Sequence, residues 1–225
     1  MKFGLRAAML AAMLVGAAHA QDTTSEKGKL SYAIGYEIGN DFVEKKMDID
    51  VNTVIRAIQD GYAKKAPAVA NEQMAEALDK MKERLYNEAK TKYEALARDN
   101  KAASDKFLAE NKVKKGIVSL PSGIQYRIIE EGTGKRPLKT SEVTMHYRGS
   151  LTTGLEFDSS FARGTPAKFK VDQVLKGWQE VIPMMKVGDH WQIFLPAEQA
   201  YGMRGNGPIG PNQALVFEIK LIDVK

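Results

Sequence analysis

The sequence predicts an α+β protein with an all-helical N-terminal part and a strand-rich C-terminal part, and three observations support this. Residues 71–111 contain neither proline nor glycine and are dominated by strong helix formers, so they predict one long helix of roughly 60 Å. Residues 143–149 alternate between polar and apolar side chains, which is typical of a half-buried β-strand. Residues 152–154 are a turn, after which residues 155–158 begin a return strand.

Residues 1–20 are predicted to be a cleaved signal peptide. Lys2 and Arg6 give a positive start, residues 7–18 are apolar, and Ala18-His19-Ala20 matches an A-x-A cleavage site. A membrane anchor is the alternative, but this apolar run is too short to span a bilayer comfortably. The chain has no cysteine and no other apolar run of membrane length. We therefore expect a periplasmic protein without disulfides or a membrane span, with outer-membrane or surface association left open.

The charge pattern argues against nucleic-acid binding. The formal net charge is +5, and removal of Lys2 and Arg6 with the signal peptide leaves +5 − 2 = +3. Both signs are interspersed along the chain, whereas a nucleic-acid-binding protein presents a basic stripe or face. We therefore expect no nucleic-acid partner.

Residues 21–70 predict a helical dimerisation domain made of two short amphipathic helices. The apolar face of the first helix consists of Leu30, Ala33, Ile34, Ile38 and Phe42. The apolar face of the second consists of Val54, Ile55, Ile58 and Tyr62. In the first helix, Gly35 and Gly39 lie four residues apart and allow another helix backbone to approach closely. Because two short helices and one long one cannot enclose a core, we expect a second copy of the chain to cover the surplus apolar faces, giving a homodimer.

Residues 71–115 are the predicted connecting helix and residues 116–225 the predicted strand-rich domain, of which residues 116–122 are a linker. Strands are expected at 124–129, 143–149, 156–158, 167–171, 190–195 and 214–224. One short helix is expected from Val174 to about Met185. A twisted antiparallel sheet wrapped on that helix leaves a hollow between them, lined by inward-facing aromatic side chains.

Asp158 is a carboxylate that the predicted strands place beside two aromatic residues, Tyr147 and Phe157. Burying a charged group among rings is costly unless it has partners. The phenol of Tyr147 and the guanidinium of Arg163 are the expected partners. A carboxylate that only caps a turn is the competing interpretation.

The motifs of several other enzyme classes fail on inspection. Residues 205–210 match the dinucleotide pattern G-x-G-x-x-G by letter, but Pro208 and Pro211 prevent the helix that this pattern requires. After the signal peptide the chain has two histidines, His146 and His190, each on a predicted strand and without a partner at metal-ligand spacing. No serine lies in a nucleophile elbow and there is no thiol. We therefore expect no metal, no cofactor and no covalent nucleophile.

Residues 143–225 resemble the FKBP-type peptidyl-prolyl cis/trans isomerases. The strings HYRGSLTTGLEFDSS, VLKGWQE, MKVGD, PAEQAYG and LVFEIKL match that family's pattern in order and spacing. The N-terminal half further resembles the exported, dimeric branch of the family, of the macrophage-infectivity-potentiator and periplasmic-chaperone type.

The resemblance implies an FKBP-like sheet wrapped on a short helix, and non-covalent rotation of X-Pro bonds in unfolded or partly folded exported polypeptides. It also implies chaperone activity, a homodimer with intertwined N-terminal helices, and binding of a macrolide inhibitor of the FK506 or rapamycin type. A binding-only periplasmic chaperone, in which the pocket grips proline with little isomerase activity, is the alternative.

The resemblance also implies the residues of the site. The implied catalytic residues are Asp158, Tyr201, Leu175 and Trp178. Trp178 forms the floor under the proline ring, the phenol of Tyr201 and the backbone N–H of Leu175 donate to substrate carbonyls, and Asp158 supplies negative potential. The implied substrate-binding residues are Tyr147, Phe157, Arg163, Phe169, Val174, Ile209 and Phe217.

Overall fold

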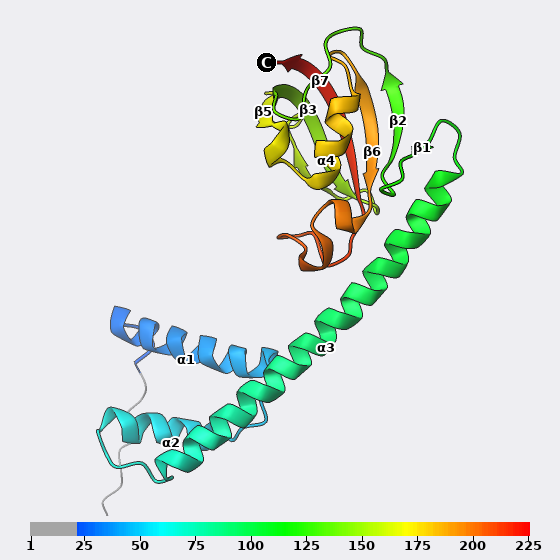
Figure 1. Cartoon of the computed structure of the whole chain (residues 1–225). Coiled ribbons are helices and arrows are strands. Elements are labelled where there is room, and N and C mark those ends of the chain that lie inside the picture. The colour runs from blue at the N-terminus through cyan, green and yellow to red at the C-terminus, as the bar shows by residue number, and fades with distance from the viewer. Residues whose placement is uncertain (1–21) are drawn as a thin grey trace, which may run out of the picture. The chain divides into compact units, whose positions relative to one another are not determined.

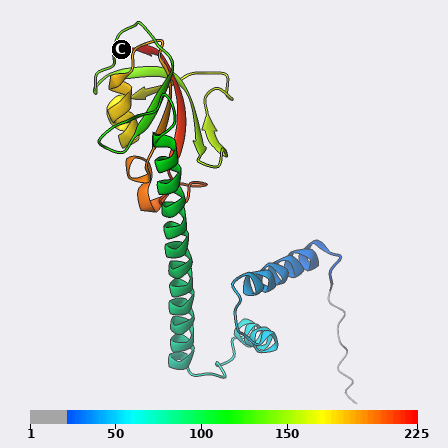
Figure 2. The same cartoon turned by 90° about the vertical axis from the view of Figure 1, so that its right-hand side faces the viewer.

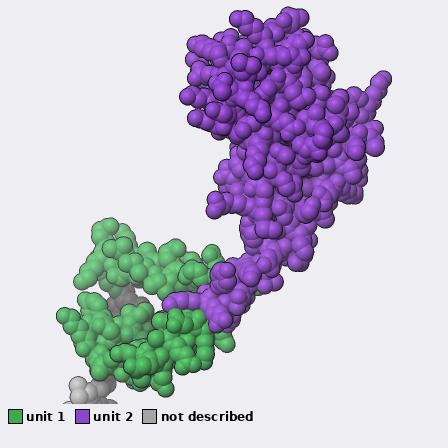
Figure 3. Space-filling view, in the orientation of Figure 1, with its two compact units in different colours: residues 1–80 green, residues 81–225 purple. Residues whose placement is uncertain are grey.

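The computed structural model describes residues 22–225, so the predicted signal peptide lies outside the described residues. The chain divides into two compact units, residues 1–80 and 81–225, and their boundary lies within the long helix α3 (Asn71–Lys112) (Figure 3). Helices precede α3 and a sheet follows it (Figures 1 and 2). The α+β class is therefore confirmed.

The first unit has helices and no strand among its described residues. Its two short helices are α1 (Glu26–Glu44) and α2 (Val51–Tyr62). Ser25 and Asp50 cap their N-termini, each accepting a hydrogen bond from the backbone N–H three residues later, at 3.0 and 2.6 Å. Among residues 22–80 only Gly28 is buried. The described part of this unit therefore has no hydrophobic core of its own within one chain.

The long helix predicted from residue 71 is present as α3. Its acidic first turn and basic last turn suit the helix dipole. Residues 81–112 of α3 belong to the second unit, where Ser104 and Asn111 are buried. The second compact unit therefore begins inside the helix, at Met81, and includes the strand-rich domain that the sequence predicts for residues 116–225.

The second unit is built on one antiparallel sheet. Its strands are β1 (Val118–Ser119), β2 (Gln125–Glu130), β3 (Glu142–Leu151), β4 (Glu156–Ser159), β5 (Ala167–Lys170), β6 (His190–Leu195) and β7 (Leu215–Val224). The strand order is β1-β2-β6-β7-β3-β4, and β5 also pairs with β3. The strands β2 to β7 lie within two residues of their predicted bounds. Strand β1 was not predicted, because it lies in the segment interpreted as a linker.

Helix α4 (Lys176–Val181) lies against one face of the sheet (Figure 1). It is shorter than the predicted helix of residues 174–185, because Val174 is extended and the chain continues after α4 only as a 3-10 turn. Pro183 lies in that turn and has no N–H to continue an α-helix. A Cβ at Gly177 would lie 2.5 Å from Leu195 of β6, so glycine at this position lets α4 approach the sheet.

The hydrophobic core of the second unit lies between α4 and the sheet. The alternating burial of β3 turns Val143, Met145 and Tyr147 inward, as its polar-apolar alternation predicts. Val181 and Ile182, at the end of α4, are fully buried in the same cluster. This packing holds α4 over the sheet and positions the residues that precede Trp178.

Candidate active site

A hollow of about 270 Å³ opens beside α4. Its lining residues are Tyr147, Phe157, Asp158, Phe169, Gln173, Val174, Leu175, Trp178, Tyr201 and Phe217. They come from β3, β4, β5, β7, α4 and the segments that precede α4 and follow β6. Gln173 is the lining residue that the sequence did not indicate. All four implied catalytic residues line the same hollow.

Trp178 is held in the hollow by neighbouring rings. Its side chain is 4% exposed. The ring centroids of Tyr147, Phe169 and Phe217 lie 5.4, 5.8 and 5.0 Å from the indole, all edge to face. The buried indole N–H has no hydrogen-bond partner among the described residues. Ring packing, a favourable arrangement of aromatic quadrupoles, therefore fixes its orientation.

Gly149 makes room for two walls of the hollow. It pairs with Asp158 of β4 on one side and with Phe217 of β7 on the other. A Cβ at this position would lie 2.6 Å from the ring of Phe157 and 2.7 Å from that of Phe217. Any side chain larger than hydrogen would force these rings apart, so the hollow depends on glycine in the middle of β3.

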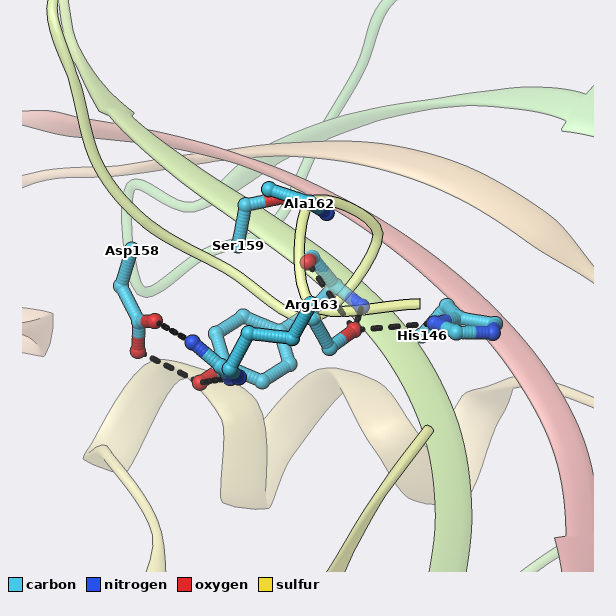
Figure 4. Close-up of polar contacts among 7 residues, drawn as sticks. His146, Asp158, Ser159, Ala162 and Arg163 are labelled. Atoms are coloured by element: carbon cyan, nitrogen blue, oxygen red, sulfur yellow. Dashed lines mark hydrogen bonds and ion pairs between the residues drawn. The ribbon is translucent and has the colours of Figure 1, made fainter. Parts of the chain in front are cut away.

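Asp158 is held by a closed triangle of polar contacts with Tyr147 and Arg163 (Figure 4). The phenol of Tyr147 donates to one carboxylate oxygen at 2.5 Å, and Arg163 donates to the other at 2.5 Å. Arg163 also donates to the phenol oxygen at 2.9 Å, and its guanidinium lies 5.6 Å from the centre of the Tyr147 ring. Each expected partner therefore contacts the carboxylate, and together they fix the position of the charge at the edge of the hollow.

The pKa of Asp158 lies below its usual value. Burial raises the pKa, but the hydrogen bonds from Tyr147 and Arg163 stabilise the charged form and outweigh burial. Burial and the hydrogen bond to Asp158 together raise the pKa of Tyr147. Near neutral pH the site therefore contains an ionised carboxylate and a neutral phenol.

The lowered pKa of Asp158 predicts a specific pH dependence of stability. Because the folded-state pKa lies below the unfolded one, the stabilisation is complete above the usual pKa of 3.8 and is lost as the pH falls through the folded value. From about pH 7 to pH 3, we expect the free energy of unfolding to fall more for the wild type than for Asp158→Asn, in which the other carboxyl groups are retained. Urea titrations at the two pH values measure this, and equal decreases would contradict it.

Ser160 supports the site from behind and was missed by the sequence analysis. Its hydroxyl accepts the N–H of Tyr147 at 2.7 Å, and its own N–H donates to the carbonyl of Tyr147 at 2.9 Å. Its hydroxyl also lies 3.1 Å from Nδ1 of His146 (Figure 4). The ring of His146 stacks on that of Phe161, with the ring centroids 4.8 Å apart. These contacts fix β3 against the end of β4. A fully buried serine two residues after Asp158 gives no signal of its own in one sequence.

Two residues implied by the resemblance are not among those lining the hollow. Arg163 contacts the site through Asp158 and Tyr147, as described above. Ile209 is 4% exposed and belongs to the core cluster that contains Trp178. Its substrate contact therefore stays a prediction without support from the lining of the hollow.

The other polar groups considered in the sequence have ordinary partners. His190 lies 2.7 Å from Glu218 through Nε2. Within residues 22–225 no group of three or more His, Cys, Asp or Glu side chains is arranged to hold a metal ion. No helix in this part of the chain is both long enough and apolar enough to cross a membrane.

The site is a small aromatic hollow with the indole of Trp178 in its wall and one carboxylate, held by two partners, at its edge. Comparisons with known proteins identify the family. Residues 134–222 match the family "FKBP-type peptidyl-prolyl cis-trans isomerase", and residues 27–128 match the "domain amino terminal to FKBP-type peptidyl-prolyl isomerase".

Three similar proteins match over nearly their whole length. The "Outer membrane protein MIP" of Legionella longbeachae is 43% identical over 212 residues, covering 94% of this chain and 91% of that protein. The "FKBP-type 22 kDa peptidyl-prolyl cis-trans isomerase" of Escherichia coli (strain K12) is 38% identical over 200 residues, covering 88% and 95%. The crystal structure of FkpA from Escherichia coli matches with a TM-score of 0.71 and 32% identity, covering 90% of this chain and 98% of that one. The chain therefore belongs to the FKBP-type peptidyl-prolyl cis-trans isomerase family.

Proposed function

We propose that the hollow around Trp178 is where this isomerase binds proline and rotates the X-Pro bond of exported polypeptides. The observation that carries the proposal is the arrangement of Asp158, Leu175, Trp178 and Tyr201 around one cavity. Rotation of a peptide bond faces a barrier of about 18–20 kcal/mol, set by resonance in the C–N bond. No covalent bond need break, so catalysis requires only that the twisted amide be bound better than the planar one.

Each residue has a role in binding the twisted amide. The proline ring rests on Trp178, between the rings that hold the indole. The N–H of Leu175 donates to one substrate carbonyl and the phenol of Tyr201 to its neighbour. Asp158, ionised at neutral pH, supplies negative potential near the rotating amide. If these contacts favour the twisted form by roughly 5–8 kcal/mol, they accelerate rotation by about 10⁴–10⁶.

The Asp158→Ala variant tests this assignment. The substitution removes the fixed charge and the carboxylate that accepts hydrogen bonds from Tyr147 and Arg163. We expect kcat/KM to fall roughly tenfold or more, which corresponds to a loss of at least about 1.4 kcal/mol of transition-state stabilisation. A protease-coupled assay with a proline peptide measures the rate, and Lys168→Ala on the exposed side of β5 serves as the control. Equal rates for the wild type and Asp158→Ala would remove the catalytic assignment.

A binding-only chaperone is the second candidate function. The N-terminal unit exposes apolar side chains that could bind an unfolded polypeptide, in addition to the hollow. It predicts that Asp158→Ala leaves the suppression of aggregation of an unfolded protein unchanged and that the wild type accelerates proline rotation little. We propose that the chain carries out both activities, isomerisation in the hollow and client holding between two copies. Macrolide inhibitors of the FK506 type are proposed ligands of the same hollow.

The homodimer is proposed from the surface of the N-terminal helices. Among the residues of α1 and α2, many large apolar side chains are exposed: Leu30, Tyr32, Ile34, Tyr36, Ile38, Val43, Val51, Ile55, Ile58 and Tyr62. A unit of this size without buried apolar side chains lacks the main driving force for folding. A second copy that contributes the same helices supplies the missing burial.

We propose export to the periplasm on the basis of the predicted signal peptide, and a relative named as an outer membrane protein agrees with export.

A further inference from the structure

One face of α3 contacts the segment 201–213, which connects Tyr201 to β7 and is called the Tyr201 loop below. The face consists of Tyr93, Ala97, Asn100 and Ser104, spaced three and four residues apart, which places them in line on one side of a helix. All four residues belong to the second unit, together with the loop. Both views of the chain show the loop, in orange, beside α3 (Figures 1 and 2).

Ser104 and Asn100 bind the end of the loop through three hydrogen bonds. The Ser104 hydroxyl donates to the carbonyl of Asn212 at 2.9 Å and accepts the N–H of Ala214 at 2.8 Å. The Asn100 side chain donates to the carbonyl of Pro211 at 2.8 Å. Ser104 and Ala214 are both buried, so loss of the hydroxyl leaves backbone groups without partners away from water.

Asn212 connects this contact to the residue next to Tyr201. Its φ of 55° lies in the left-handed region, which asparagine adopts more readily than most residues. Its backbone N–H donates to the carbonyl of Gly202 at 2.9 Å, and its side chain donates to the carbonyl of Ala97 at 3.2 Å. The phenol of Tyr93 donates to the carbonyl of Met203, on the far side of Gly202. The backbone on the C-terminal side of Tyr201 is therefore tied to α3 directly and through Asn212.

We propose that α3 is a positioning element of the catalytic site, with Asn100 and Ser104 fixing the loop so that the phenol of Tyr201 lies at the hollow. This inference rests on the proposed catalytic role of Tyr201. It differs from the role of α3 as a connector, which requires none of these contacts. A backbone held in an uncommon conformation persists where its surroundings over-determine it, and at Asn212 the surroundings that do so are α3 and Gly202.

The test is a double-mutant cycle in the full chain. The pair Asn100→Ala and Ser104→Ala is made in the wild type and in Tyr201→Ala. The matched control pair is Asp99→Ala and Asp105→Ala, which lies on the exposed side of the same two turns. We expect the first pair to lower kcat/KM about five- to tenfold in the wild type and less than about twofold in the Tyr201→Ala background. Assays are run well below the melting temperature of each variant, so that the folded fraction is equal.

Each outcome decides the proposal. An equal loss in both backgrounds, or a loss no larger than that of the control pair, would show that α3 stabilises the fold without positioning Tyr201. A Tyr201→Ala variant with the wild-type rate would overturn it as well. If the pair does not fold, Asn100→Ala alone, which keeps the buried hydroxyl, is carried through the same cycle. The proposed function has a separate test: it is contradicted if Asp158→Ala has the same kcat/KM as the wild type.

Discussion

Trp178→Ala is expected to cause the largest loss of stability and activity of any single substitution in the hollow. The indole is 4% exposed and is surrounded by three rings, so its removal leaves a cavity that the sheet cannot fill. Substitutions of this kind lower the free energy of unfolding by about 3–5 kcal/mol. The proline ring also loses the surface on which it rests, so kcat/KM per folded molecule falls as well. Urea unfolding and the peptide assay measure the two effects.

Trp191→Ala is the matched control for that prediction. Trp191 is 5% exposed, stacks on Tyr126 at 4.5 Å and, like Trp178, has a buried indole N–H without a partner among the described residues. It does not line the hollow. We therefore expect a comparable loss of stability but a near-normal kcat/KM for the molecules that remain folded at low temperature. If both variants lose activity equally, the indole of Trp178 has no role beyond packing.

Replacement of Gly35 and Gly39 by leucine is expected to convert the proposed dimer into a monomer. Neither position has an atom within 4 Å of an added Cβ in the single chain, so the substitutions fit the isolated helix. Leucine also has a higher helix propensity than glycine, so α1 itself is strengthened. A loss of dimerisation would then report a clash with the partner's helix. Sedimentation equilibrium of the chain from residue 21 onward measures the mass.

Glu37→Leu together with Asp41→Leu is the control on the side of α1 away from the two glycines, beside Ile34 and Ile38 of the predicted apolar face. It adds the same bulk and more apolar surface, and the exposed pair between Asp41 and Lys45 that it removes contributes little to stability. We expect this variant to remain dimeric. If the glycine variant also sediments with twice the mass of one chain, the prediction that the two helices approach closely at these glycines is wrong.

The sequence determined the order of the elements and most of their bounds. A strand that is buried on one face must alternate, and β3 does; a helix of over forty residues must avoid proline and glycine, and α3 does. The short sequence motifs around Asp158 and Trp178 were sufficient to indicate the family. Each motif contains the residues of a turn together with the site residues next to it. Local patterns of this kind are visible in one sequence since the residues involved are neighbours.

Contacts between residues far apart in the chain are visible in the folded structure and not in the sequence. Ser104 lies 108 residues from Asn212, and a polar residue on an otherwise charged helix predicts an exposed side chain, not a buried hydrogen bond. The same holds for Gly149, whose necessity follows from the rings of Phe157 and Phe217, and for the start of the second unit at Met81. These features depend on which surfaces of the folded chain come into contact. Close side-chain packing determines those contacts, and a local periodicity in the sequence does not indicate them.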